Sequence, residues 1–421
     1  MDITIVQKSS LGILYILMRI LYTFSIYLYA SAIRIASLFN PKAKLFLQGR
    51  KGLFDHLKSK IQNPKSNNLV WFHCASLGEF EQGRPLMEKL KLQQPEIKIL
   101  LTFFSPSGYE IRKNYSVADF IFYLPMDTPS NARKFIEIVK PQKVFFVKYE
   151  FWFNYLNELK NKNIPTYLVS GIFREDHHFF KSIGGWFRKQ LTAFTHFFLQ
   201  DEKSIELLNS IGYTNTTLCG DTRFDRVFEV AKNAKQIDLV KQFVGNNKTI
   251  IVGSSWMEDE KIVQSLKLEN LKLIIAPHEI DEKHISFVEL LFKNSVRFSK
   301  ATEKNVIDAQ VLIIDNIGML SSLYQYGSVA FIGGGFGKGI HNILEAATFG
   351  LPIIFGPNYE KFKEAKELIK LGGAFSIKNV SELEKTMSLL SDEQVLKTAS
   401  QISRMYVQGR VGATDKILEK I

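Results

Sequence analysis

The stretch that decides the fold is LVWFHCASLGEFEQG, residues 69–83. Its first part, 69–75, is short and almost continuously apolar, which is typical of a β-strand that helices cover on both faces. The segment from Ser76 to Glu79 follows directly and has the S-x-x-E spacing of a helix capping box. A buried strand that leads straight into a helix is the repeating unit of a parallel sheet, so the stretch predicts an α/β fold.

The same alternation continues along the chain. Apolar runs of strand length are separated by helix-length segments such as 81–94 and 129–140, and this βαβα order predicts parallel sheets with right-handed crossovers. A polar, charged stretch after about residue 230 divides the runs into two series, so two doubly wound sheets are expected. The predicted strands are 69–75, 97–104, 143–149, 165–171 and 196–200 in the first series, and 249–255, 271–279, 311–315, 328–335 and 351–357 in the second.

The length of 421 residues is too great for one ordinary hydrophobic core, so two domains are expected. We assign 41–230 to a first Rossmann-like domain and 231–421 to a second. The final helical stretch, 392–421, is a candidate to cross back to the first domain. Because open parallel sheets bind ligands at the carboxyl ends of their strands, a ligand cleft between the two sheets is expected.

Residues 1–40 are assigned to a membrane anchor. Within them, 11–33 is an apolar run whose one charge is Arg19, and its length can cross a bilayer as a helix. The segment 34–65 is strongly basic, which places the rest of the protein in the cytoplasm. Two alternatives stay open: a helix that lies in the interface with Arg19 snorkelling, and a cleaved signal peptide with small residues at 30–32.

The net charge of +12 and a pI near 9.3 suggest a polyanionic partner. The basic residues cluster beside the apolar run, and no RNA- or DNA-binding motif is recognisable, so an anionic membrane surface is favoured over nucleic acid. Cys74 and Cys219 are far apart and belong to no CxxC pattern. We expect both to be buried thiols, with no disulfide and no zinc site.

Two carboxylates follow strands of the first series. Glu79 fits two interpretations: it completes the capping box, or it is a general base at the cleft, with Gly78 allowing a close approach of substrate. Glu150 and Trp152, in VKYEFWFNYL (147–156), lie at the mouth of the same sheet. The alternative for Glu150 is an ordinary solvated side chain.

A glycine-rich stretch marks the second series. In FIGGGFGKGIHNILEA, residues 331–346, five glycines fall within 333–339, after a strand and before a helix that Asn342 is placed to cap. Backbone N–H groups at such a turn can bind an anion. The stretch matches neither the P-loop nor the dinucleotide fingerprint. The charged and polar candidates there are Lys338 as a counter-charge, His341 as a donor and Glu345, which also fits an N-x-x-E cap.

Two further strand ends belong to the second series. GSSWMEDE (253–260) places Ser255 three residues before Glu258, a second capping-box pattern at a helix start. APHE (276–279) places His278 at the carboxyl end of a strand, where a buried, satisfied histidine is the alternative. Together with the glycine stretch, three strand ends of one sheet are expected to converge on one site.

The combination of motifs resembles the Kdo transferases, the 3-deoxy-D-manno-octulosonic acid transferases of lipopolysaccharide assembly. The resemblance covers about 10–410 and rests on HCASLGEFEQGRPLMEKL, SPSGYE, YLPMDTP, YEFWFN, GDTRFD, GSSWMEDE, APHE and FIGGGFGKGIHNILEAATFGLPIIFGP, in this order. It implies a GT-B fold of two Rossmann-like domains with an N-terminal membrane-anchor helix. The first domain would bind a lipid A precursor (lipid IVA), and the second would bind CMP-Kdo.

The resemblance also implies the reaction. Kdo would move from CMP-Kdo to the lipid with inversion, without a metal or other cofactor, at the cytoplasmic face of the inner membrane. The alternative is another membrane-associated GT-B glycosyltransferase that uses a UDP- or GDP-sugar, and HCASLGE argues against it. A nucleic-acid-binding module is the alternative from a different class.

Site residues follow from the match. Glu79 corresponds to the catalytic base and Glu150 to an acidic residue near the transferred sugar. The chain departs from the usual family pattern at Lys148, Phe153 and Ile340, so the fine donor contacts are not carried over. No acceptor-binding residue and no metal ligand is assigned. The donor-binding candidates are Ser254, Ser255, His278, Gly334, Gly335, Lys338, His341, Asn342 and Glu345.

Overall fold

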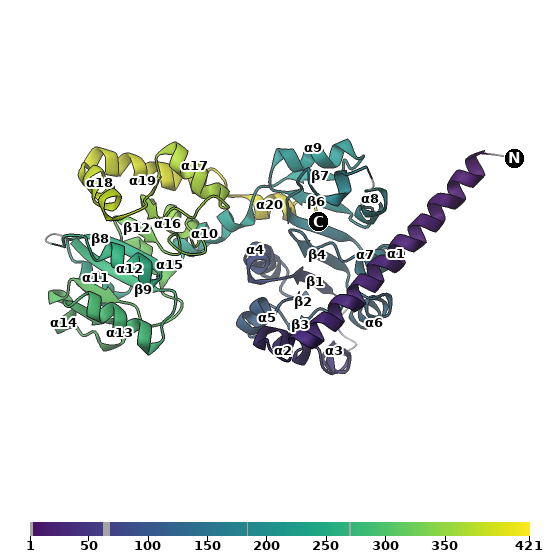
Figure 1. Ribbon diagram of the computed structural model, residues 1–421, viewed down its shortest axis with the longest axis horizontal. Coiled ribbons are helices and arrows are strands. Elements are labelled where there is room, and N and C mark those ends of the chain that lie inside the picture. The colour runs from purple at the N-terminus through teal and green to yellow at the C-terminus, as the bar shows by residue number, and fades with distance from the viewer. Residues whose placement is uncertain (1–2, 62–67, 183, 269–270) are drawn as a thin grey trace. The chain divides into compact units, whose positions relative to one another are not determined.

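The computed structural model describes residues 3–61, 68–182, 184–268 and 271–421, with side chains from residue 16 onward. The chain divides into two compact units (Figure 1). The first unit comprises Met1–Arg223 and Gly412–Ile421, and the second comprises Phe224–Val411. Sequence-based assignment placed the division at 230, whereas the structure places it after Arg223 and groups the last residues with the first unit.

The first unit contains a seven-stranded sheet in the order β3-β2-β1-β4-β5-β6-β7. Every neighbouring pair of strands is parallel, as predicted. The strands are β1 Leu69–Cys74, β2 Lys98–Phe103, β3 Phe120–Tyr123, β4 Lys143–Val147, β5 Thr166–Gly171, β6 His196–Leu199 and β7 Thr216–Leu218. The helices are α1 Ile3–Ala36, α2 Pro41–Gln48, α3 Leu53–Ile61, α4 Leu77–Gln93, α5 Pro106–Arg112, α6 Pro129–Val139, α7 Phe153–Asn161, η1 His178–Phe180, α8 Gly185–Leu191, α9 Glu202–Ser210, α10 Thr222–Lys232, which continues into the second unit, and α20 Ala413–Leu418.

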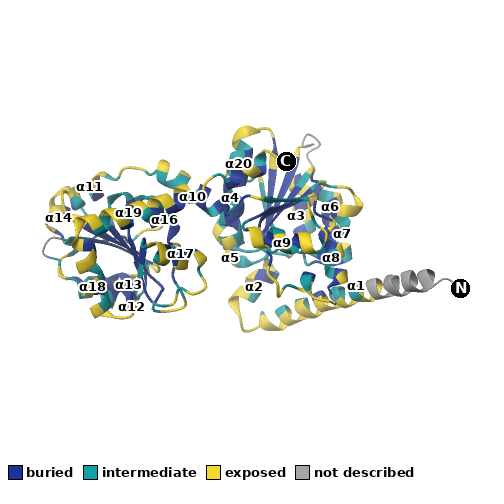
Figure 2. Ribbon diagram, turned by 90° about the horizontal axis from the view of Figure 1, so that it is seen from above, coloured by how far each residue is buried: buried dark blue, intermediate teal, exposed yellow. Residues whose placement is uncertain are grey.

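Helices cover both faces of this sheet, and the strands between them are buried (Figure 2). Successive side chains of β1 enter opposite cores, as the period of a strand requires. Trp71 packs with residues of α6 and α7, whereas Phe72 packs with residues of α4 and α20. Cys74 and Cys219 are free thiols and both are buried, as predicted for their side chains.

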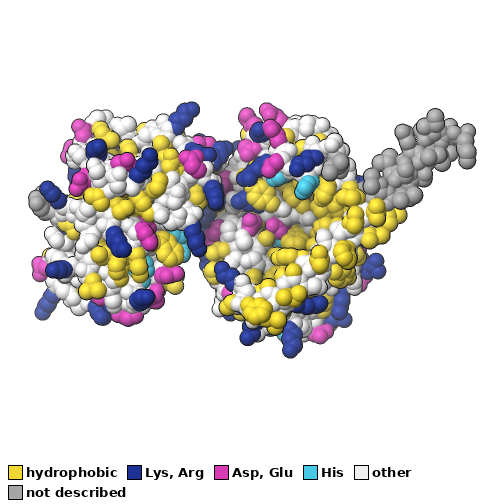
Figure 3. Space-filling view, in the orientation of Figure 1, with side chains coloured by type: hydrophobic (Ala, Val, Ile, Leu, Met, Phe, Trp, Pro, Cys, Tyr) yellow, Lys and Arg dark blue, Asp and Glu magenta, His cyan; other side chains and the backbone are white. Residues whose placement is uncertain are grey.

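Helix α1 extends along the first unit and contacts it on one side. Tyr22 packs against Phe153 and Trp186, with ring centroids 4.8 and 5.8 Å away. The described part of α1, Ile16–Ala36, is long and apolar enough to cross a membrane. Figure 3 shows hydrophobic side chains along it. Its exposed apolar side chains include Ile16, Leu17, Ile20, Leu21, Phe24, Tyr27 and Leu28.

The second unit contains a seven-stranded parallel sheet in the order β10-β11-β9-β8-β12-β13-β14, which confirms the second predicted sheet. Its strands are β8 Lys248–Ser255, β9 Leu271–Pro277, β10 Ser295–Arg297, β11 Val311–Ile313, β12 Val329–Ile332, β13 Ile353–Phe355 and β14 Ala374–Ser376. Its helices are α11 Asp238–Val244, α12 Met257–Val263, α13 Glu282–Leu291, η2 Phe298–Lys300, α14 Glu303–Asp308, α15 Leu320–Leu323, η3 Tyr324–Tyr326, α16 Leu344–Thr348, α17 Lys363–Leu371, α18 Val380–Ser391 and α19 Glu393–Gln408.

The final helical stretch is two helices instead of one. Helix α19 ends at Gln408, and α20 begins after Gly412, whose φ of 109° is a left-handed conformation that suits glycine. Ala413 and Ile417 of α20 are buried in a core shared with α4 of the first unit. Lys89 of α4 also forms an ion pair with Asp415.

Candidate active site

Glu79 lies in the first turn of α4, just beyond the carboxyl end of β1, and is half-buried. The hydroxyl of Ser76 donates a hydrogen bond to the Glu79 carboxylate. Ser76 is the N-cap residue of α4, yet its side chain makes no capping hydrogen bond to the helix backbone. Ser76 and Glu79 therefore do not form a capping box in the structure. Helix capping does not explain why a carboxylate stands at position 79.

Glu150 follows β4 and is almost fully buried, with 9% of its surface exposed. Its Oε2 accepts a hydrogen bond from Trp152 Nε1 at 2.5 Å and lies 3.3 Å from His73 Nε2. Among the described residues, the other oxygen, Oε1, has no hydrogen-bond donor. The interpretation of Glu150 as an ordinary solvated side chain is therefore wrong.

The ring of His73 connects Glu150 to the interior of the sheet. His73 is on β1 and fully buried, and its Nδ1 lies 2.8 Å from the hydroxyl of Thr102 on β2. That hydroxyl accepts the indole N–H of Trp71 at 2.8 Å. His73 Nε2 accepts the indole N–H of Trp152 at 3.0 Å, so neutral His73 carries its proton on Nδ1 and donates it to the Thr102 hydroxyl.

Both carboxylates lie near the end of β1. Burial raises the pKa of the Cys74 thiol, and the negative charges of Glu79 and Glu150 add to this effect. Because β1 and β4 are adjacent strands, their carboxyl ends meet at one edge of the first sheet. The structure thus brings together the two carboxylates that the sequence singled out.

In the second unit, three aromatic rings stack at the carboxyl ends of β8, β9 and β12. The His278 ring lies 4.7 Å from the Trp256 ring and 4.4 Å from the His341 ring, centroid to centroid. Because His278 is exposed, its interpretation as a buried, satisfied histidine is wrong. These strands are neighbours in the sheet, and their ends converge as expected.

His341 is held in one tautomer. Its Nε2 accepts the indole N–H of Trp256 at 3.2 Å, so a neutral ring carries its proton on Nδ1. Burial, together with the nearby His278, lowers the pKa of His341 to about 4. At neutral pH this side chain is therefore an uncharged donor.

The GSS turn differs from its predicted role. The Ser255 hydroxyl is fully buried and donates to Glu260 Oε1 at 2.8 Å, and Glu260 in turn pairs with His284 at 2.9 Å. Ser254 is in the left-handed region with φ of 54°, a costly conformation for serine that marks a tight, over-determined turn. The Ser255 hydroxyl is thus engaged inside the protein.

The cap of α12 also differs from its prediction. Helix α12 begins after Trp256, and the side chain that accepts the Trp256 N–H, at 2.9 Å, is Asp259 instead of Glu258. The same Oδ2 of Asp259 accepts the Gly334 N–H at 2.8 Å. Burial raises the pKa of Asp259 to about 6. This carboxylate therefore connects the GSS turn to the glycine-rich stretch.

Close packing explains part of the glycine-rich stretch. A Cβ on Gly333 would lie 2.4 Å from the Ser254 carbonyl oxygen, and one on Gly335 would lie 2.5 Å from the backbone of Gly356. Gly334 has a φ of 89°, and a Cβ there would lie 2.5 Å from the Gly339 carbonyl oxygen. These contacts leave no room for a side chain.

Most N–H groups of this stretch are engaged. Those of Gly333, Gly334, Gly337 and Gly339 donate to acceptors within the protein. Within the part of the chain that the structure describes, the N–H groups of Gly335, Phe336 and Lys338 have no acceptor. Of the N–H groups in the predicted anion-binding turn, these three are therefore the ones that remain to bind an anion.

The remaining donor candidates lie beside this stretch. Asn342 accepts the N–H of Leu344, the first residue of α16, at 3.1 Å, and donates to Glu345 Oε1 at 3.0 Å. The Asn342–Glu345 contact favours the alternative in which Glu345 supports the helix start. Lys338 is exposed, and no described acidic residue pairs with it.

Two residues at this edge of the first sheet, His73 and Thr102, escaped sequence reasoning because they look like ordinary members of apolar strands. Trp152 is expected at the mouth of the sheet, and its indole N–H is shared by Glu150 and His73. The contacts of His73 and Thr102 depend on the pairing of β1 with β2 and β4. In the described residues, no group of three or more His, Cys, Asp and Glu side chains is placed to hold a metal ion.

Comparisons with known proteins agree with this architecture. The profile of a family described as 3-deoxy-D-manno-octulosonic-acid transferase (kdotransferase) matches residues 48–226. The chain is 30% identical over 352 residues to the 3-deoxy-D-manno-octulosonic acid transferase of Aquifex aeolicus, covering 81% of this chain and 90% of that protein. It is 27% identical over 372 residues to the enzyme of the same name from Rickettsia bellii, covering 84% and 87%.

Among solved structures, UDP-GlcNAc 2-epimerase from Neisseria meningitidis, bound to UDP-GlcNAc, superimposes with a TM-score of 0.58. The sequence identity is 15%, and the match covers 83% of this chain and 98% of that chain. A likeness at this identity concerns the fold alone. It agrees with the predicted GT-B arrangement of two Rossmann-like units.

Proposed function

The chain belongs to the 3-deoxy-D-manno-octulosonic acid transferase family and is a Kdo-transferring glycosyltransferase, and from this membership we propose its donor, acceptor and mechanism. The donor is CMP-Kdo, and the acceptor is a lipid A precursor, lipid IVA, in the synthesis of the lipopolysaccharide core. The observation that carries the proposal is Glu79, a carboxylate at the carboxyl edge of the first sheet that the helix cap does not use.

Glu79 is the general base of an inverting transfer. It removes the proton from an acceptor hydroxyl, whose oxygen then attacks the anomeric carbon of Kdo. The bond from that carbon to the phosphate oxygen breaks, and the electron pair leaves with cytidine monophosphate. The Ser76 hydroxyl supports this role because its hydrogen bond fixes the orientation of the carboxylate.

Glu150 acts near the transferred sugar, with His73 and Trp152 as positioning residues. The indole N–H of Trp152 is shared between Oε2 of Glu150 and Nε2 of His73, so Oε1 remains for substrate. A carboxylate held through one oxygen presents the other in a defined position, which is what the orientation of a sugar hydroxyl or of developing positive charge requires.

The second unit binds the nucleotide sugar at the ends of β8, β9 and β12. The free N–H groups of Gly335, Phe336 and Lys338, with the Lys338 ammonium, suit a phosphate. His341 adds an uncharged donor through Nδ1. The remaining donor-binding residues in this proposal are Ser254, Ser255, His278, Gly334, Asn342 and Glu345, of which Ser255 acts by shaping the turn.

These donors stabilise the charge on the departing cytidylate, so we propose that transfer needs no metal ion. The test is turnover in the presence of excess chelator, which is expected to match turnover without chelator. The proposed location is the cytoplasmic face of the inner membrane, with α1 as the anchor.

The experiment that tests the function is a donor comparison. Full-length protein in neutral detergent is incubated with lipid IVA and either CMP-Kdo, a UDP-sugar or a GDP-sugar, and the products are identified by mass spectrometry. A mass gain of one or more Kdo units from CMP-Kdo alone is expected. Transfer from a UDP- or GDP-sugar, with none from CMP-Kdo, would overturn the proposal in favour of the alternative donor class.

A further inference from the structure

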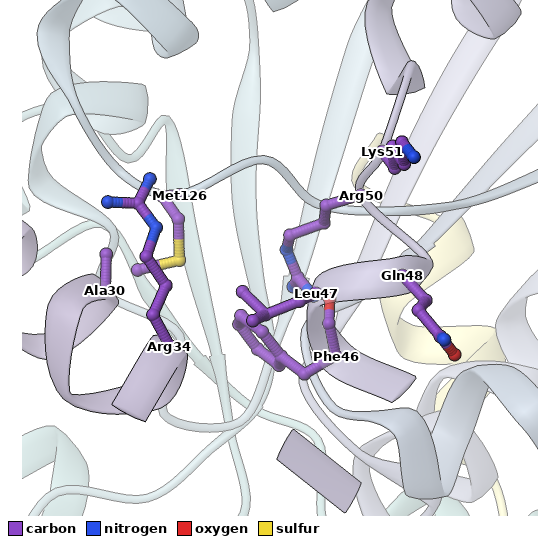
Figure 4. Close-up of a pocket in the computed structure, with 8 residues that line it drawn as sticks. All are labelled: Ala30, Arg34, Phe46, Leu47, Gln48, Arg50, Lys51 and Met126. Carbon is purple, nitrogen blue, oxygen red and sulfur yellow. The ribbon is translucent and has the colours of Figure 1, made fainter. Parts of the chain in front are cut away.

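A cavity of about 410 Å³ lies between the C-terminal part of α1 and helix α2 (Figure 4). Phe46 and Leu47 of α2 and Met126 form its apolar walls, and no acidic residue lines it. Three cationic side chains also line it: Arg34 of α1, and Arg50 and Lys51, which follow α2. In Figure 4, Arg34 and Met126 stand opposite Phe46, Leu47 and Arg50, and Lys51 lies beyond Arg50.

Among the described residues, no acidic side chain serves as a counter-ion for Arg50. Its guanidinium donates to the carbonyl oxygens of Leu124, Phe46 and Phe104 at 2.9, 3.0 and 2.7 Å and stacks over the Phe46 ring at 3.5 Å. Three of its five N–H donors are thus used, which leaves two. No described carboxylate pairs with it, and burial lowers its pKa to about 9. A partly buried charge in this state is stabilised by an anion.

Arg34 and Lys51 add to the same positive field. Both side chains are exposed, and neither forms an ion pair with a described residue. Apolar walls beside three unpaired cations suit an amphiphile that carries a phosphate, because the walls accept hydrocarbon or sugar and the guanidinium groups bind phosphate oxygens.

The cavity lies at the depth of lipid head groups if α1 enters a membrane. Arg34 is in the last turn of α1, at the end of the apolar segment Ile16–Ala36, where basic residues meet the interface. The cavity is also close to the first-unit carboxylates. Phe104 contacts Phe46, with ring centroids 5.2 Å apart, and also contacts Trp152, the partner of Glu150, at 4.4 Å.

We propose that this cavity binds a phosphate group of the lipid acceptor, with Arg34 and Arg50 as its main partners and Lys51 at the rim. The inference rests on the proposed function for the identity of the acceptor, and it supplies the acceptor contacts that the sequence left unassigned. The rings of Phe104 and Trp152 connect the cavity wall at Phe46 to Glu150.

The test measures binding without donor. Full-length protein in neutral detergent is titrated with lipid IVA and with the same lipid after enzymatic removal of its phosphates. The test variant is the double substitution Arg34→Gln, Lys51→Gln. The matched control is Lys42→Gln, Lys44→Gln, which removes the same charge from exposed positions of α2 that do not line the cavity.

We expect wild-type protein to bind the phosphorylated lipid at least about tenfold more tightly, a typical size for loss of one charge-assisted contact. The test variant should lose most of this preference, and the control should keep it. Equal loss in both variants, or no preference in the wild type, would overturn the proposal. So would equal competition by phosphatidylglycerol, because the cavity would then bind any anionic lipid. Absence of Kdo transfer with retained phosphate preference would count against the proposed function alone.

Discussion

At the scale of single residues, the orientation of Glu150 depends on His73. This histidine does not itself take part in the reaction. The His73 ring lies between Thr102 of β2 and the indole of Trp152, so it cannot rotate without breaking a hydrogen bond. Misplacement of a reacting group by about 1 Å can lower a rate by about 10²-fold. His73 is therefore a positioning residue whose loss should affect the chemical step.

The prediction for His73 concerns kcat. His73→Phe removes the acceptor that fixes the Trp152 indole beside Glu150 and should lower kcat by about ten- to a hundredfold, with little change in the KM for CMP-Kdo. His73→Gln should recover part of the loss because its amide oxygen can accept from a similar position. Steady-state kinetics on both variants check this, and a His73→Phe enzyme with wild-type kcat would contradict it.

The buried carboxylate Asp127 gives a prediction about pH. Asp127 accepts hydrogen bonds from the Tyr22 hydroxyl at 2.6 Å and from the N–H groups of Asn154 and Tyr155 at 3.1 and 3.0 Å. Burial is the main cause that raises its pKa from 3.8 to about 6. Because the folded state holds this proton more tightly than the unfolded state, Asp127 lowers the free energy of unfolding as pH rises from about 4 through about 6.

Across that pH range the free energy of unfolding should change by at most about 3 kcal/mol, because each unit of pKa shift corresponds to about 1.4 kcal/mol. Asp127→Asn cannot ionise, so its unfolding temperature should vary less than the wild-type value between about pH 4 and about pH 7, where the wild-type carboxylate is mostly charged. Thermal unfolding in neutral detergent measures this. A pH dependence equal to that of the wild type would show that Asp127 does not titrate in this range.

Sequence reasoning found the two carboxylates because each directly follows an apolar strand. It could not assign partners, since hydrogen bonds such as Ser255 to Glu260 or His73 to Thr102 depend on side-chain direction and strand pairing. The capping patterns misled for the same reason: spacing permits a cap at Ser76 and at Ser255, but the local geometry uses neither hydroxyl in that way.

At the scale of elements, every strand that the apolar runs predicted is present, and the four that they missed are the edges of the two sheets: β3, β7, β10 and β14. An edge strand pairs on one side only and is short and less buried, so it needs no continuous apolar run. Strand β7, TTL, is an example, because none of its residues is buried. Hydrophobic patterning therefore predicts the central strands of a sheet more reliably than its edge strands.

The turn after β12 gives a prediction about stability. Gly334→Ala places a side chain at a positive φ and within 2.5 Å of a carbonyl oxygen. The expected loss is at least about 1–3 kcal/mol of unfolding free energy. Gly337→Ala is the matched control in the same turn, because its Cβ would meet nothing nearer than 3.6 Å. Denaturant unfolding compares the two, and equal stability would mean that the turn rearranges.

At the scale of the whole molecule, the proposed membrane attachment depends on the exposed face of α1. Ile20 and Phe24 are 59% and 64% exposed, so Ile20→Lys with Phe24→Lys should leave the fold intact. Each lysine at the centre of a spanning helix costs roughly 2.5–3.5 kcal/mol. The variant should therefore stay at the bottom of the gradient in a flotation assay and not float with the liposomes. Leu290→Lys with Ile307→Lys, also at exposed apolar positions, is the control and should float with the liposomes as the wild type does.

The central claim is that a carboxylate of the first unit acts as base on a hydroxyl that attacks a sugar held by the second unit. The direct measurement is the transfer rate of Glu79→Gln with CMP-Kdo and lipid IVA, beside Glu81→Gln, a carboxylate on the same helix that pairs with Arg112. We predict that Glu79→Gln lowers the rate by about 10²–10⁴-fold, with donor affinity and unfolding temperature near the wild-type values. A Glu79→Gln enzyme as active as Glu81→Gln would contradict the account.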